Sequence, residues 1–80
     1  MARALVSLQS LKVLLNLELA TLDGCEAIEV SGIKVRPTPD SDGCNWEVAS
    51  YSGHVAHQCT SLITALIGAM RHRYNVGNRV

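Results

Sequence analysis

The chain has 80 residues, of which 48% are hydrophobic and 18% charged, and its seven lysines and arginines balance its seven acidic residues. This length suits one small domain, and the apolar content excludes a disordered tail. A net charge of zero argues against a dedicated nucleic-acid binder, which usually concentrates positive charge. We therefore expect a single domain over residues 1–80, without a cofactor, because no nucleotide or phosphate-loop fingerprint occurs.

Residues 4–22 predict a first helix that ends at Asp23-Gly24. At 100° per residue, one apolar stripe faces the core, and a second stripe lies roughly opposite to it; the second stripe consists of Val6, Val13, Leu17 and Ala20. A surface helix needs only one such stripe. The second stripe therefore predicts self-association, most simply as a homodimer. Coverage by the second helix or by a chain end is the alternative.

Residues 26–36 predict a tight hairpin with Ser31-Gly32 as its two-residue turn, since glycine supplies the positive φ that such turns need. In this register Val30 faces Ile33, and Glu29 faces Lys34 on the other side. Residues 45–51 then form a third strand.

A final helix is predicted from about residue 53 to 74, with Ser52 as its N-cap. The expected fold is α+β, in the order α-β-β-β-α, with a three-stranded antiparallel meander and both helices packed on one face.

Charge is unevenly distributed along the chain. All seven acidic residues lie between Glu18 and Glu47, whereas the part after Glu47 carries three arginines and three histidines. Arginines at the end of the final helix complement its negative pole; a basic end that docks on an acidic partner is the alternative. The exposed sheet face is expected to be solvated, and a docking surface formed by Lys34, Arg36 and Tyr51 is the alternative there.

Three cysteines cannot all pair within one chain, and Cys59 falls on the apolar face of the final helix, so we expect reduced thiols in a cytoplasmic protein. In the meander, Cys25 and Cys44 would lie about 10 Å apart, too far for a disulfide. The segment Leu22-Asp23-Gly24-Cys25 is similar to a lipoprotein cleavage site, but polar residues interrupt the apolar stretch before it, so export is not expected. No run approaches the roughly 18 apolar residues of a membrane span.

Metal binding and catalysis have candidate residues but no supporting spacing. Three cysteines with His54 and His57 are suitable zinc ligands, yet no C-x2-C pair occurs. Cys44 with either histidine is the only nucleophile–base couple, and nothing in the sequence places them together. We therefore expect neither a metal site nor an enzyme.

At Gly43-Cys44-Asn45-Trp46 and Arg73-Tyr74-Asn75, the chain resembles a group of small uncharacterised bacterial proteins that pair a GCNW segment with a C-terminal helix ending in YN. The resemblance implies a cytosolic bacterial protein and carries no functional residues. The residues themselves predict structural roles, in which Gly43 permits a turn and Trp46 fills the core.

The predicted function is that of a non-catalytic bacterial interaction or accessory protein that self-associates through its first helix. The alternative is a nucleic-acid-binding module, because the order helix–three strands–helix matches that of double-stranded-RNA-binding domains. Those domains place lysines at the start of their final helix, where this chain has the segment 54–58 without a lysine.

Overall fold

Six elements follow one another in the order β-α-β-β-α-β. The computed structural model describes residues 3–54 and 56–77. Its elements are β1 (Ala4–Val6), α1 (Leu8–Leu19), β2 (Ile28–Val35), β3 (Trp46–Gly53), α2 (Cys59–Arg73) and β4 (Tyr74–Val76). The expected helices and α+β class are confirmed, whereas the boundaries and the sheet differ from the expectation.

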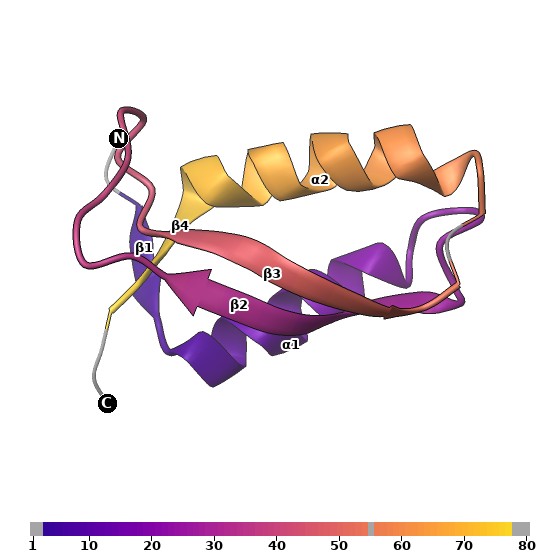
Figure 1. The fold of residues 1–80 in the computed structure, drawn as a ribbon, viewed down its shortest axis with the longest axis horizontal. Helices are drawn as coiled ribbons and strands as arrows, with labels where there is room; N and C mark the ends of the chain where they lie inside the picture. The colour runs from indigo at the N-terminus through magenta and orange to yellow at the C-terminus, as the bar shows by residue number, and fades with distance from the viewer. Residues whose placement is uncertain (1–2, 55, 78–80) are drawn as a thin grey trace.

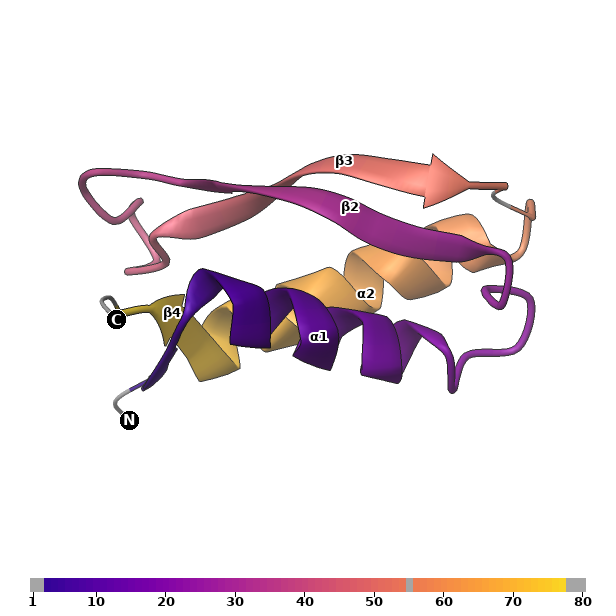
Figure 2. The same ribbon diagram turned by 90° about the horizontal axis from the view of Figure 1, so that it is seen from below.

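The strands form two separate two-stranded sheets, so the predicted three-stranded meander is wrong. β2 and β3 pair antiparallel, and β1 pairs in parallel with β4. Both helices run along the same side of the β2–β3 ribbon (Figure 2). The short β1–β4 pair lies at the end where α1 begins and α2 stops (Figure 1).

The predicted turn at Ser31-Gly32 is also wrong, because β2 continues straight through it. Ser31 and Ala49 have no partner in the β2–β3 ladder, so each strand carries one extra residue at this place. An extra residue moves the following side chains to the opposite face. The buried residues Ile28 and Val30 therefore precede a second apolar pair, Ile33 and Val35, in the opposite phase.

Gly32 leaves room at this bulge for the Ser50 side chain, which lies directly against it. A Cβ at Gly32 would sit 2.6 Å from Oγ of Ser50, and the hydroxyls of Ser31 and Ser50 are hydrogen-bonded at 2.9 Å. The glycine thus permits close approach of the neighbouring strand rather than a chain reversal.

Both helices start later than the sequence predicted. Ser7 is the N-cap of α1, and its Oγ accepts a hydrogen bond from the N–H of Ser10 at 3.1 Å, which leaves residues 4–6 free to form β1. Ser52 caps no helix but lies within β3, which runs to Gly53. Gly53 has a φ of +101°, and a Cβ there would meet the carbonyl oxygen of Ala27 at 2.0 Å.

The core lies between the ribbon and the two helices. Trp46 is its largest member and is fully buried, with Nε1 donating to the carbonyl of Tyr74 at 3.0 Å. The other buried residues are Leu11, Leu15, Leu19, Cys25, Ile28, Val30, Cys44, Cys59, Ile63 and Met70. The ribbon and helices therefore share one aliphatic core, with Trp46 as its single fully buried aromatic residue, next to β4.

Cys25 and Cys59 form a disulfide, which corrects the expectation of reduced thiols. Their Cα atoms are 5.3 Å apart, and both residues are fully buried. The bond joins the loop before β2 to the first residue of α2. Cys44 is the free cysteine of the described residues and is buried.

The outer edge of β2 is closed by a side chain instead of a third strand. Asn16 of α1 accepts a hydrogen bond from the N–H of Val30 at 2.7 Å and donates to the carbonyl of Val30 at 3.2 Å. These are the two bonds that a neighbouring strand would supply. The ribbon therefore needs no further strand at this position.

The Cys25–Cys59 disulfide should contribute strongly to the free energy of unfolding. Linking residues 34 apart in sequence lowers the entropy of the unfolded chain, which corresponds to roughly 3–4 kcal/mol. Replacing both Cys25 and Cys59 by Ala should lower the free energy of unfolding by about this amount in urea titrations. Thiol counting in denaturant without reductant should give one free thiol per native chain; three free thiols would show that the bond is absent.

Candidate functional site

The most unusual surface of the molecule is the side of α1 that faces away from the core. Val13 is 52% exposed and Leu17 is 61% exposed, and Ala20 directly after the helix is also exposed. Val6 belongs to β1 instead, where it is half-buried and packs against the core. Three of the four residues predicted for self-association thus share an exposed surface, and the fourth contributes to the domain's own packing.

This surface carries no charge. At 100° per residue, the exposed residues on the outward side of the helix are Gln9, Ser10, Val13, Leu17 and Ala20, which we call the α1 outer face. Lys12 and Glu18 lie on its two flanks, outside this set. An uncharged helix face with two large aliphatic side chains at positions i and i+4 is suited to contact another apolar surface.

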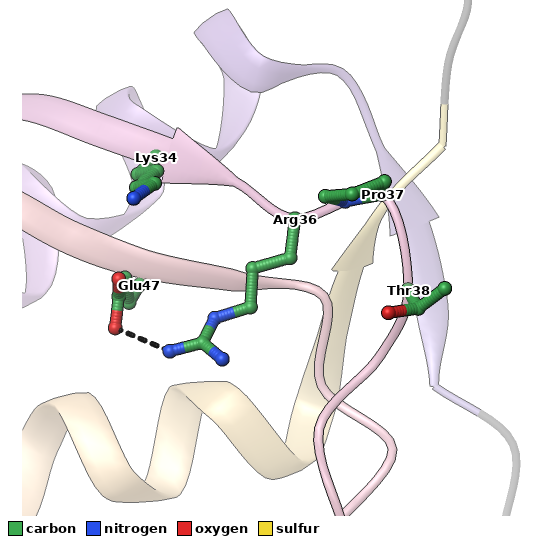
Figure 3. Close-up of a pocket in the computed structure, with 5 residues that line it drawn as sticks. All are labelled: Lys34, Arg36, Pro37, Thr38 and Glu47. Atoms are coloured by element: carbon green, nitrogen blue, oxygen red, sulfur yellow. Dashed lines mark hydrogen bonds and ion pairs between the residues drawn. The ribbon is translucent and has the colours of Figure 1, made fainter.

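A second surface feature is an open hollow of about 330 Å³ at the end of the ribbon (Figure 3). It is lined by Lys34, Arg36, Pro37, Thr38 and Glu47. Nη2 of Arg36 binds the Glu47 carboxylate at 2.8 Å. This hydrogen bond, together with the positive charge of Arg36, holds the pKa of Glu47 below its ordinary value.

The predicted docking surface is only partly assembled in this hollow. Lys34 and Arg36 line it together, but Tyr51 does not. Tyr51 is the ladder partner of Val30 beyond the bulge, and cross-strand partners share a face. Burial raises the pKa of the Tyr51 hydroxyl. The hollow offers an ammonium, a guanidinium and a hydroxyl as donors, but Glu47 offsets one of the two cations.

The two segments GCNW and RYN are brought into direct contact. The Asn45 side chain accepts from the N–H of Val76 at 3.0 Å and donates to the carbonyl of Val76 at 2.8 Å. The Asn75 amide donates to the carbonyl of Gly43 at 3.0 Å. Trp46 completes the contact through its bond to Tyr74. These residues therefore have a shared structural role, which is to fix β4 against the start of β3.

An arginine network lies beside this contact. Arg71 of α2 forms an ion pair with Asp40, and its Nε donates to Sγ of Cys44 at 3.4 Å. Nε of Arg3 donates to the carbonyl of Arg71 at 2.7 Å. The pKa of Asp40 is lowered chiefly by the N–H of Cys44, and further by the N–H of Asp42 and the charge of Arg71. The network connects β1, the loop before β3 and the end of α2.

The candidate metal ligands and catalytic residues do not assemble into a site. His54 and His57 are exposed near the start of α2, Cys25 and Cys59 are bonded to each other, and Cys44 is buried beside Arg71. Within residues 3–54 and 56–77, no group of three or more ligand-type side chains could hold a metal ion. None of the helices in these ranges has both the length and the apolar character required to cross a membrane.

Comparison of the chain with protein-family models, with curated proteins and with solved structures finds no match.

The lowered pKa of Asp40 predicts that the fold loses stability in acid. A carboxyl group whose folded pKa lies below its ordinary value of 3.8 stabilises the fold above that pH. This contribution is lost as the pH falls through the lower, folded value. Thermal unfolding between pH 6 and pH 2 should therefore show a smaller loss of stability for Asp40→Asn than for the unsubstituted protein. The Asn oxygen can still accept the two backbone hydrogen bonds, and equal pH profiles would show that Asp40 does not contribute as a charge.

Proposed function

We propose that this protein is a non-catalytic interaction or accessory protein that self-associates through the α1 outer face. The observation that supports the proposal is the exposure of Val13 and Leu17 on one uncharged side of a helix. Full burial of a side chain of this size contributes roughly 1.5–3 kcal/mol, and because about half of each of these two is still exposed, roughly 1–2 kcal/mol of it remains to be gained per side chain. The domain's own helices and strands leave that free energy available to a partner.

A second copy of the chain is the partner that this surface fits. A two-fold interface brings identical patches together, so any charge in its centre would meet the same charge. The α1 outer face avoids this repulsion because it contains none. Two copies would bury the exposed half of four large side chains, with a gross gain of roughly 3–7 kcal/mol against an association cost of about 4–15 kcal/mol. We therefore expect a weak dimer that forms at high micromolar to millimolar concentrations and dissociates on dilution.

The alternative of a nucleic-acid-binding module has less support than it had from the sequence. The observed element order is not that of a double-stranded-RNA-binding domain. Arg3, Arg36 and Arg71 are each engaged by groups of this chain. RNA affinity at moderate salt that falls steeply as salt rises would nevertheless favour this alternative.

Bacterial origin and cytoplasmic location remain proposals that rest on the resemblance of the GCNW and RYN segments. The cytoplasm contains reductants that can cleave a disulfide such as the Cys25–Cys59 bond. Both residues are completely buried, which limits attack by an external thiol. We infer that the resemblance reflects the contact between β4 and the start of β3, and not a shared catalytic activity.

Glutamate substitutions on the α1 outer face test the proposal. Leu17→Glu and Val13→Glu should each weaken the dimer at least tenfold, because the new charge occurs twice in a two-fold contact and must be desolvated there. Sedimentation equilibrium over a concentration series measures the effect. Ala65→Glu, at an exposed position of α2, is the matched control and should leave the dimer unchanged. A monomeric unsubstituted protein at millimolar concentration would refute the proposal.

A further inference from the structure

The folded molecule has two oppositely charged ends. Four acidic residues lie towards the end where α1 stops and α2 begins, which we call the acidic end: Glu18, Asp23, Glu26 and Glu29. Neither segment that forms this end, 18–29 or 52–62, contains a lysine or arginine. The uneven distribution of charge along the sequence thus becomes a separation in space.

The opposite end is basic. It holds β1, β4, the end of α2 and the loop between β2 and β3 (Figure 1). Five cationic residues belong to this basic end, against the three carboxylates of Asp40, Asp42 and Glu47: Arg3, Lys34, Arg36, Arg71 and Arg73. The described basic end therefore has an excess of two positive charges, and the acidic end has four uncompensated negative charges.

α1 runs from one end to the other, with its outer face between them. It begins next to β1 at the basic end and stops at Leu19, close to the acidic end (Figure 2). Two helices in contact can run parallel or antiparallel. The charged ends make these two arrangements unequal, because parallel copies place like ends together and antiparallel copies place opposite ends together.

We infer that two copies pair through α1 in an antiparallel, two-fold arrangement centred at the level of Leu15. This inference rests on the proposed self-association and adds its orientation and register. The basic end of each copy then lies beside the acidic end of the other. Antiparallel packing also sets the two helix dipoles in opposite directions, which is the favourable arrangement.

The α1 outer face is self-complementary in this register. Val13 and Leu17 lie two residues before and after Leu15, so Val13 of one copy meets Leu17 of the other. Ser10 and Ala20 lie five residues before and after it, so they meet in the same way. At a rise of 1.5 Å per residue, the two Ser10 residues are separated by about 15 Å along the axis. Each large side chain therefore packs against a large one, and each small one against a small one.

Cysteine cross-linking distinguishes the two arrangements. Ser10→Cys and Ala20→Cys are prepared as separate single variants, mixed, oxidised with copper phenanthroline and analysed by mass spectrometry without reductant. A disulfide requires Cα atoms within about 7 Å. We expect the mixed Ser10→Cys/Ala20→Cys cross-link to exceed each self-cross-link at least tenfold. The unsubstituted protein, with Cys44 buried and the other cysteines bonded, is the control.

The remaining outcomes separate the inference from the proposed function. Abundant self-cross-links in each single variant would establish parallel pairing, which overturns the inference and leaves self-association in place. A dimer by sedimentation without any cross-link would move the contact away from the α1 outer face. A monomer at all concentrations would overturn both.

The direction of the salt effect gives an independent measurement on the unsubstituted chain. Screening weakens contacts between opposite charges and relieves repulsion between like charges. The dimer dissociation constant should therefore rise severalfold between 50 and 500 mM NaCl. Asp23→Asn with Glu29→Gln removes two charges of the acidic end and should reduce this dependence. A dissociation constant that falls with salt would contradict the antiparallel arrangement.

Discussion

The contact between Asn45 and Val76 holds the two terminal strands of the fold, β4 directly and β1 through it. The Asn45 amide supplies β4 with the donor and the acceptor that a neighbouring strand would provide, and the indole N–H of Trp46 donates to the carbonyl of Tyr74, the first residue of β4. β4 in turn supports β1 through their parallel ladder. Because α1 follows β1 after one residue, its N-cap Ser7, the start of the first helix is tied to this pair of strands. At the opposite end, the Cys25–Cys59 disulfide joins the loop after α1 to the start of α2. The two helices are thus fixed at both ends of the ribbon.

Asparagine side chains replace strands twice in this fold. Asn16 pairs with the backbone of Val30 at the outer edge of β2, as Asn45 does with Val76 at β4. A small domain has few strands, so a large share of its backbone polar groups lies at sheet edges, where they need partners other than a further strand. One amide satisfies one donor and one acceptor without adding length to the chain. These contacts explain how sheets of only two strands each find hydrogen-bond partners for backbone groups at their edges.

Local periodicity in the sequence predicted both helices, a strand at residues 45–51, where the structure has β3, and the apolar outward side of α1, because each of these depends on neighbouring residues. It failed where the structure depends on distant ones. Between Val30 and Ile33 the apolar residues move from even to odd positions. This pattern predicts a turn, because a turn and a β-bulge change the alternation of side chains in the same way. The matching change between Val48 and Tyr51 on β3 was the signal that both strands carry an extra residue.

β1 and β4 have three residues each and are 70 residues apart, so no local pattern marks them. The Cys25–Cys59 pairing likewise depends on where α2 starts. At the candidate sites, Lys34 and Arg36 line one hollow, whereas Tyr51 lies beyond the bulge and outside it.

The narrowness of the ribbon accounts for the exposed side of α1. Two strands, about 4.8 Å apart, offer less width than two helices of roughly 10 Å diameter, so each helix contacts the ribbon with only part of its circumference. α2 meets this constraint mainly with small and polar exposed residues, among them Thr64, Ala65 and Gly68, and with one large aliphatic side chain, Leu62, which is 38% exposed. α1 meets the same constraint with Val13 and Leu17 instead. Packing within the domain imposes no requirement for large aliphatic side chains at these two positions, because a polar residue there would preserve the helix and remove the cost of apolar exposure. The difference between two helices in equivalent positions is therefore the strongest physical reason to assign the outward side of α1 to contact with another molecule.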